Sequence, residues 1–420
     1  MAFWRRIWGR EQESSIASCT ALDIGTEFVK ALVFEVDGAG RGTVRGVGRK
    51  RQGLAHMQSG TVTDIAAVVD NCTVALQEAE EMAGFRPTQV VIGIAGELVK
   101  GFTTTKTLER KRADSPITDA ELQRLIDGVQ HEALRSAERS ITWETGLPQV
   151  DVRLVHAAVT AAQIDGYPVT NPVGFKGRHV KISIFNAFAP LVHLGALQSV
   201  AQELELELLE IVAEPYAVAR VMASEQVQQS GALFIDVGGG TTDVALVRHG
   251  GIEGTRMFAL GGRAFTKSIA DRLDLPFPRA EEVKIDYARG LEVPRRDEVA
   301  RIVADDVAIW SAGVELVLEE LAEGDLLPSR VYLCGGGSRL HEIEAILCDE
   351  KFWRRLPFSR PPEVLIMVPA QAENIVDATG LLVDQQDVTP LGLAYQAIEL
   401  QTTEDPLDAA LRRVLRAMKM

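Results

Sequence analysis

Three short glycine-containing turns, each at the end of an apolar run, contain the residues best suited to chemistry. They are residues 23–26 (Asp-Ile-Gly-Thr), 236–242 (Asp-Val-Gly-Gly-Gly-Thr-Thr) and 334–338 (Cys-Gly-Gly-Gly-Ser). Glycine lets the backbone approach a ligand closely, and consecutive backbone N–H groups form a concavity that binds anions. An aspartate at the end of a strand can hold Mg²⁺ through its water shell, because Mg²⁺ loses water reluctantly. The turns therefore predict a site for a polyphosphate and its magnesium.

The first two turns belong to a pattern that occurs twice. Asp23 and Asp236 lie about half the chain apart, and each is followed by the same Ala-Leu-Val sequence, at 31–33 and at 245–247. A single Asp-x-Gly after a strand is more often an ordinary hairpin, so the prediction depends on the duplication and on the third turn. The chain has neither GxxxxGK[ST] nor GxGxxG, which disfavours P-loop and classical dinucleotide-binding folds.

The elements around the turns alternate between strand and helix patterns. This alternation, together with the duplication, predicts two similar α/β lobes. Residues 97–186 have a different sequence pattern, in which two strands with alternating polar residues are expected to flank a helix. That helix begins at Thr118-Asp-Ala-Glu121, a capping box in which each end satisfies a free backbone N–H. The block is predicted to be a small α/β insertion. A long helical region over 280–323 is expected to be interrupted near Pro294.

At these residues the chain resembles the actin-like ATPase superfamily. The resemblance implies an α/β, actin-like ATPase fold with two duplicated ribonuclease-H-like lobes and a small α/β subdomain inserted in the first lobe. It places the first lobe at 18–96, 187–212 and 389–403, and the second lobe at 213–388. The segments 213–217 (Ala-Glu-Pro-Tyr-Ala) and 389–394 (Thr-Pro-Leu-Gly-Leu-Ala) resemble the two crossings between the lobes.

The same resemblance implies ATP and Mg²⁺ as ligands, with Asp23 and Asp236 holding the metal largely through water. Glu281 and Lys284 match a Glu-x-x-Lys helix and would flank the ribose and base. Glu214 and Asp236 are the candidate catalytic residues. Glu214 could orient an attacking water, or it could be a satisfied helix-capping residue. The nucleotide-binding set implied is Asp23, Gly25, Thr26, Lys30, Gly238, Gly239, Gly240, Thr241, Thr242, Glu281, Lys284, Gly335, Gly336, Gly337 and Ser338.

Within that superfamily the chain is most similar to the FtsA family of bacterial cell-division proteins. The insertion at 97–186 and its Asn171-Pro-Val-Gly174 turn carry this resemblance. It implies a protein that polymerises head to tail at the division site, on the inner face of the cytoplasmic membrane. There it would anchor the FtsZ ring and contact downstream division proteins. The FtsZ tail would bind within the arginine-rich stretch 262–301, and ATP hydrolysis, where it occurs, would be slow.

The C-terminal stretch 404–420 is predicted to be an amphipathic helix. Apolar residues recur at spacings of three and one, and the cations fall on the remaining surface, a pattern typical of a helix that lies in a membrane and is attracted to anionic lipid. A packed terminal helix or a helix that binds a partner is the alternative. The apolar residues are Leu407, Ala410, Leu411, Val414, Leu415 and Met418, and the cations are Arg412, Arg413, Arg416 and Lys419.

Composition narrows the setting of the protein. The 420 residues contain 44 basic and 59 acidic side chains, a net charge of −15, which argues against a nucleic-acid binder. The four cysteines are scattered without metal-binding spacing, and no apolar run approaches the length of a spanning helix. A reducing, cytoplasmic location is expected. In the basic N-terminal tail, 1–17, the stripe of Phe3, Trp4, Ile7 and Trp8 is either a second membrane contact or an ordinary frayed terminus.

Two other functions fit parts of the pattern. A relative of PilM, the cytoplasmic actin-like protein of type IV pilus machines, would bind a short peptide from an inner-membrane partner and would need no lipid anchor of its own. A sugar kinase of the same superfamily would need a catalytic aspartate in a sugar pocket, and the sequence places no further acidic turn for one.

Overall fold

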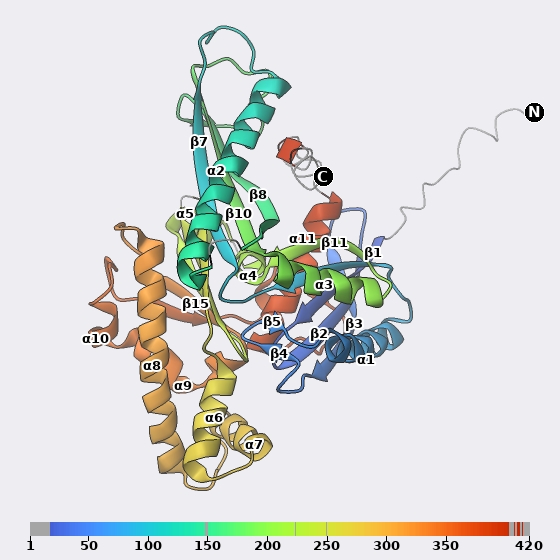
Figure 1. The fold of residues 1–420 in the computed structure, drawn as a ribbon, viewed down its shortest axis with the longest axis vertical. Coiled ribbons are helices and arrows are strands. Elements are labelled where there is room, and N and C mark those ends of the chain that lie inside the picture. The colour runs from blue at the N-terminus through green and yellow to red at the C-terminus, as the bar shows by residue number, and fades with distance from the viewer. Residues whose placement is uncertain are drawn as a thin grey trace, which may run out of the picture.

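The computed structural model describes residues 17–147, 150–222, 224–248 and 250–402, together with positions 407, 410, 411 and 414. Two large sheets organise the chain, and helices cover their faces (Figure 1). Among the described residues, no helix is long and apolar enough to cross a lipid bilayer.

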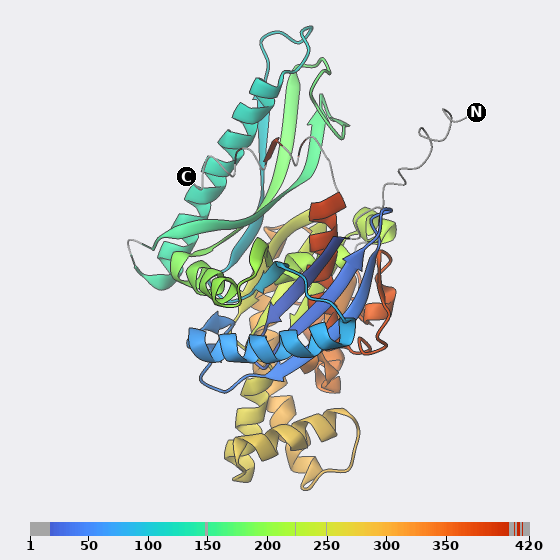
Figure 2. The same cartoon turned by 90° about the vertical axis from the view of Figure 1, so that its right-hand side faces the viewer.

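The first sheet has six strands in the order β11-β6-β1-β2-β3-β17. Helices α1 and α3 pack on one face, where their apolar residues join those of β1, β2 and β6 in a single core (Figure 2 shows α1 lying across the strands). Helix and sheet approach closely, since a Cβ at Gly48 would lie 1.8 Å from the carbonyl oxygen of Ala75. The elements are β1 (Ala17–Ile24), β2 (Phe28–Val36), β3 (Gly42–Arg51), β4 (Met57–Gln58), β5 (Thr61–Val62), α1 (Ile65–Ala83), β6 (Gln89–Ile94), α3 (Leu191–Glu203), β11 (Glu207–Ala213) and β17 (Ile375–Asp377).

The second sheet has nine strands in the order β16-β15-β12-β13-β14-β7-β10-β8-β9. Its first five strands form the second lobe, with α6 to α9 packed against them. The expected break near Pro294 is confirmed, because α7 ends at Ala288 and α8 begins at Arg296. The elements are α5 (Glu225–Ser230), β12 (Ala232–Val237), β13 (Thr242–Arg248), β14 (Gly251–Phe258), α6 (Gly262–Leu273), α7 (Phe277–Ala288), α8 (Arg296–Ala322), β15 (Arg330–Cys334), η1 (Gly336–Arg339), α9 (His341–Cys348), α10 (Glu350–Trp353), β16 (Glu363–Ile366), η2 (Pro369–Gln371) and η3 (Gln385–Asp387).

The inserted unit contributes the other four strands and one long helix. Its elements are β7 (Lys100–Glu109), α2 (Asp119–Thr145), β8 (Val152–Ile164), β9 (Tyr167–Pro168) and β10 (His179–Pro190). The predicted capping box is present, because Thr118 N–H donates to Glu121 Oε2 at 2.9 Å and Glu121 N–H donates to Thr118 Oγ1 at 3.3 Å. The unit has three long strands where two were expected. Strand β10 runs to Pro190, and it pairs with β8 from Val180 to Pro190.

The inserted unit is also continuous with the second lobe. Strand β7 pairs with β14 through Gly101 opposite Thr255 and Phe102 opposite Gly254. These two pairs join the three long strands of the insertion to the second sheet, although the insertion lies between elements of the first lobe in the sequence. Figure 1 shows the insertion at one end of the molecule and α6 to α8 at the other.

Two helices contain the segments that resemble the crossings between the lobes. Helices α4 (Glu214–Val221) and α11 (Val388–Thr402) pack directly on each other. A Cβ at Gly392 would lie 2.7 Å from the carbonyl oxygen of Ala217, so the crossing depends on a glycine at that point. Both helices contribute to the apolar core that lies between the two sheets.

The C-terminal stretch is described only in part. Leu407, Ala410, Leu411 and Val414 are helical and buried, and they join the core of the inserted unit. All four described positions of the tail are therefore packed against protein, as expected for a packed terminal helix. The remaining predicted tail residues, Arg412, Arg413, Leu415, Arg416, Met418 and Lys419, lie outside the described residues, as does the N-terminal stretch with Phe3, Trp4, Ile7 and Trp8.

A buried histidine in α3 gives the fold a predictable response to acid. His193 is 4% exposed, and burial lowers its pKa from 6.5 to about 4. Between these pH values the unfolded chain binds a proton at His193 that the folded protein does not bind. The contribution of His193 to the free energy of unfolding is therefore complete above pH 6.5 and is lost as the pH falls toward 4. From pH 7 to pH 5 the wild type should lose about 2 kcal/mol of unfolding free energy that a His193→Leu variant does not lose.

Urea unfolding at the two pH values measures this difference. Equal losses in the wild type and the His193→Leu variant would contradict the prediction.

Candidate functional site

Two hairpins of the same design, one in each lobe, bring their acidic residues to one cleft. In β1–β2 the register pairs Asp23 with Lys30, and in β12–β13 it pairs Asp236 with Asp243. Each first aspartate is the next-to-last residue of its strand, and its partner follows seven positions later. The duplicated sequence pattern is therefore a duplicated structure. The cross-strand partner is a cation in the first lobe and a second carboxylate in the second lobe.

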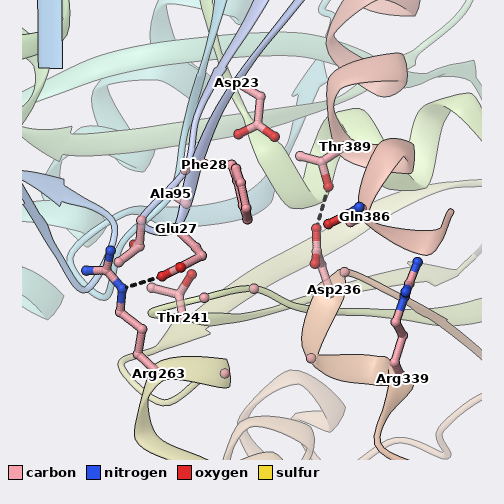
Figure 3. Close-up of a pocket in the computed structure, with 18 of the residues that line it drawn as sticks. Asp23, Glu27, Phe28, Ala95, Asp236, Thr241, Arg263, Arg339, Gln386 and Thr389 are labelled. Carbon is pink, nitrogen blue, oxygen red and sulfur yellow. Dashed lines mark hydrogen bonds and ion pairs between the residues drawn. The ribbon is translucent and has the colours of Figure 1, made fainter. Parts of the chain in front are cut away.

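The hairpins enclose a cavity of about 270 Å³ between the lobes. In Figure 3 the carboxylates of Asp23 and Asp236 point toward the same space. All three predicted glycine turns line this cavity. From the predicted set, the lining residues are Asp23, Gly25, Thr26, Lys30, Glu214, Asp236, Gly238, Gly239, Thr241, Glu281, Lys284, Gly335, Gly336 and Gly337.

The turns approach each other and their own aspartates closely. A Cβ at Gly240 would lie 2.7 Å from Thr26 Oγ1, so the turns of the two lobes face each other across the cleft. Gly335 has a φ of +83°, and a Cβ there would lie 2.1 Å from Asp236 Oδ1. Only glycine fits at Gly335, both for its backbone conformation and for the space available.

Buried negative charge dominates the electrostatics of the cavity. Burial raises the pKa of Asp236, and it raises the pKa of both Glu214 and Asp243 well above the usual range, with neighbouring carboxylates adding to each shift. Lys30 Nζ lies 3.0 Å from Asp23 Oδ2, and this ion pair raises the pKa of Lys30 despite the opposing effect of burial. Lys30 is therefore a partly buried countercharge to the cluster.

Two further hydrogen bonds hold the acidic cluster in place, and one carboxylate oxygen has no hydrogen-bond partner among the described residues. Thr389 Oγ1 donates to Asp236 Oδ2 at 2.5 Å, and Lys30 Nζ donates to the carbonyl oxygen of Gln386 at 2.8 Å. Buried Asp243 Oδ1 has no hydrogen-bond partner among the described residues. Among the residues that the structure describes, no three His, Cys, Asp or Glu side chains are grouped so as to hold a metal ion.

The comparisons with known proteins show what the whole chain is similar to. A family model described as "Cell division protein FtsA" matches residues 233–377. The cell-division protein FtsA of Pseudomonas aeruginosa is 28% identical over 353 residues, covering 79% of this chain and 80% of the relative. FtsA of Neisseria meningitidis is 29% identical over 346 residues, covering 77% of this chain and 79% of the relative. The chain is related to FtsA.

Solved structures confirm the predicted fold. The PilM–PilN type IV pilus biogenesis complex contains a chain that matches with a TM-score of 0.62 at 19% identity, covering 91% of this chain and 98% of that one. MreB5 of Spiroplasma citri bound to ADP matches with a TM-score of 0.50 at 15% identity, covering 92% of this chain and 99% of that one. At these identities the likeness concerns the fold alone. The FtsA-related chain has the two-lobed actin-like fold.

The Glu-x-x-Lys pair of this FtsA relative lies on α7 at the edge of the cavity. Lys284 Nζ contacts Glu281 Oε2 at 2.8 Å and donates to the carbonyl oxygen of Gly262 and to Thr266 Oγ1, each at 2.8 Å. These contacts fix the two side chains beside the start of α6. The pair therefore forms part of the wall beside the second lobe's turn.

Three residues of the predicted set support the turns and are not among those that line the cavity. The hydroxyl of Thr242 donates to the carbonyl oxygen of Leu260 at 2.7 Å and accepts from Trp310 Nε1 at 2.9 Å. Ser338 Oγ donates to the carbonyl oxygen of Gly335 at 2.8 Å. Gly240 is the third, and it contacts the first lobe's turn as described above.

Several lining residues were not predicted from the sequence. Asp243 could have been found by superposing the two repeats, because it occupies the place of Lys30. Glu27, Phe28 and Arg339 directly follow two of the predicted turns in the sequence. Arg263, Gln386 and Thr389 reach the cavity from other elements through long-range packing, which no local pattern predicts.

One of these residues ties the two lobes together. Arg263 Nε, on α6, lies 2.8 Å from Glu27 Oε2 in the turn between β1 and β2 (Figure 3). Its Nη1 also donates to the carbonyl oxygens of Leu54 and Met57, each at 3.4 Å. At the wall of the cavity, this side chain therefore links α6 to the first lobe's turn and to the loop that contains Leu54 and Met57.

Replacing Arg263 with alanine should therefore loosen the first lobe's loop over 53–60. The pair is partly buried and charge-assisted, so we expect backbone amides there to exchange about five- to tenfold faster. Hydrogen–deuterium exchange of the full chain measures the change. An Arg279→Ala variant, which removes an exposed ion pair with Glu282, should leave the loop unchanged. Unaltered exchange in the Arg263→Ala variant would contradict the role assigned to this contact.

Proposed function

We propose that this chain is an ATP-binding, actin-like cell-division protein that polymerises at the cytoplasmic membrane and anchors the FtsZ ring. One observation carries the ligand part of the proposal: equivalent aspartates from two duplicated hairpins line one cavity with three glycine turns. The relatives that are named cell-division protein FtsA support the division role.

The residues present fit a magnesium–nucleotide complex. The glycine turns offer backbone N–H groups to phosphate, and the surplus of buried carboxylates around Asp236 and Asp243 favours a nearby cation. Asp23 and Asp236 would hold Mg²⁺ largely through water, and Glu281 and Lys284 would lie beside the ribose and base. When bound, the magnesium–triphosphate complex would contact turns of both lobes and so link them electrostatically. Glu214, buried at the start of α4, would orient a water in the same cavity.

The proposed assembly uses surfaces away from this cavity. Filament contacts would be heterologous, head to tail, because that symmetry gives open polymers. The inserted unit would make filament or downstream division contacts. The FtsZ tail would bind α6, α7 and the start of α8, a region in which Arg272, Arg279 and Arg295 are paired with acidic neighbours. An acidic peptide would have to compete with those intramolecular pairs.

Electron microscopy on a lipid monolayer, with and without Mg-ATP, tests the proposal as a whole. Filaments that form only with both lipid and nucleotide are the expected result. Monomers under every condition would overturn it. Fluorescence anisotropy with an FtsZ C-terminal peptide tests the partner separately. Loss of binding is expected when the charges of Arg272, Arg279 and Arg295 are reversed.

The burial of the tail stripe favours a second candidate, a PilM-like component of type IV pilus assembly. Such a protein would bind a peptide from an inner-membrane partner and would need no exposed lipid anchor. Deleting residues 404–420 and measuring co-sedimentation with anionic liposomes separates the two candidates. Loss of binding on deletion supports the division role, whereas binding that is unchanged, or absent from the start, supports the pilus role.

A further inference from the structure

The apolar stripe of the C-terminal stretch is covered by protein. Leu407, Ala410, Leu411 and Val414 are between 1% and 3% exposed. Their spacing places them on one side of a helix, and all four are helical in the structure. This is the same stripe that a membrane-bound helix would insert into lipid.

The wall that covers the stripe belongs to the inserted unit. The four residues share one apolar cluster with residues of α2, β8 and β10, and Figures 1 and 2 show the short red segment beside these elements. We call this wall the docking surface. Its members in the cluster are Ile117, Leu122, Leu125, Ile126, Val129, Ala162, Ile164, Val180, Ile182 and Ile184.

The connection to the docking surface is short. Helix α11 ends at Thr402, and Leu407 is already packed in the cluster five residues later. Five residues span at most about 18 Å, so the stripe is held at high effective concentration beside its own inserted unit. This short connection therefore favours docking of the stripe on the inserted unit of the same chain, rather than on that of a second copy.

We propose that the inserted unit is a receptor for the chain's own C-terminal helix, and that docking and membrane insertion exclude each other. One stripe cannot be buried in protein and in lipid at the same time, so the docked chain is held off the membrane. Release of the helix would leave apolar residues of α2 and β10 uncovered. The exclusion rests on the proposed membrane function, whereas the docking does not.

Hydrogen–deuterium exchange of the full chain without lipid tests the docking. Deleting residues 404–420 should speed exchange in peptides covering 117–129 and 180–184 by at least about tenfold, because these segments lose their cover. Unchanged exchange in both peptides would overturn the proposal. The peptide covering 65–83, on α1, has no part in this cluster and serves as the internal reference.

A point variant checks that the stripe itself makes the contact. Ala410 is 2% exposed within the packed cluster, so an Ala410→Leu variant should overfill the contact and speed exchange in the same two peptides. An Ala409→Leu variant adds the same apolar group outside the four-residue stripe and should leave exchange unchanged. Equal effects of the two variants, or no effect of either, would contradict docking through this stripe.

Vesicles of anionic phospholipid test the exclusion. For the wild type, vesicles should bind the chain and at the same time speed exchange in 117–129 and 180–184. Vesicle binding with the docking surface still protected would overturn the exclusion. No vesicle binding, with the lipid-free results as expected, would refute the membrane function and leave the docking intact.

Light scattering tests whether the helix docks on its own chain. A dimeric mass that becomes monomeric on deletion of residues 404–420 would show that the helix docks on a second copy, and it would overturn the same-chain assignment.

Discussion

A single methyl group at Gly335 is expected to abolish useful nucleotide affinity. An alanine there would have to hold a φ of +83° and would place its Cβ 2.1 Å from Asp236 Oδ1 and 2.5 Å from the carbonyl oxygen of Val237. The turn or the aspartate must move, and Asp236 is one of the two carboxylates on which the proposed magnesium site depends. We expect Mg-ATP affinity to fall by at least about 100-fold, which corresponds to about 2.7 kcal/mol.

The neighbouring glycine provides a matched control for the fold. At Gly336 the nearest atom to a new Cβ would be Gln386 Oε1, at 3.8 Å, and the backbone is not in the left-handed region. A Gly336→Ala variant should therefore unfold within about 0.5 kcal/mol of the wild type, whereas Gly335→Ala should lose about 2–4 kcal/mol. Denaturant unfolding and calorimetric titration with Mg-ATP measure the two effects. Equal unfolding free energies, or unchanged affinity in the Gly335→Ala variant, would contradict the argument.

The parts of this site that depend on local chemistry could be predicted from the sequence. Glycine turns after buried strands are short-range features, and the repeat of Asp23 at Asp236 identified which turns matter. The Thr118 capping box and the break near Pro294 were found for the same reason: a few neighbouring residues determine them. Duplication turned weak local patterns into a prediction about two places at once.

Contacts between distant segments could not be predicted in this way. Nothing near Arg263 in the sequence indicates that its partner is Glu27, and nothing near Gly101 indicates that β7 extends the second lobe's sheet. The tail shows a deeper limit. An apolar stripe with flanking cations suits a lipid surface and an apolar protein wall equally well, so the pattern of Leu407 to Val414 identifies a buried face but not what buries it.

Removing the charge of Lys30 should destabilise the protein strongly at neutral pH. Lys30 pairs with Asp23, and Asp236, Asp243 and Glu214 lie buried in the same cavity. A Lys30→Met variant keeps much of the side-chain volume but leaves these carboxylates without their partly buried countercharge. Breaking one side of a buried ion pair costs about 3–5 kcal/mol of unfolding free energy. A Lys50→Met variant, at an exposed position on β3, should stay within about 0.5 kcal/mol of the wild type.

The pH dependence of that loss distinguishes an electrostatic cause from a packing defect. Asp236, Asp243 and Glu214 have raised pKa values in the folded protein, so it holds more protons than the unfolded chain as the pH falls, and stability from these groups is lost as the pH rises. The charge of Lys30 lowers the pKa values of Asp236 and Glu214, so without it these two pKa values should rise further. The difference in unfolding free energy between wild type and Lys30→Met should therefore shrink as the pH is lowered from about 8 to about 5. A difference that stays constant over this range would mean that Lys30 stabilises the cavity by packing and not by its charge.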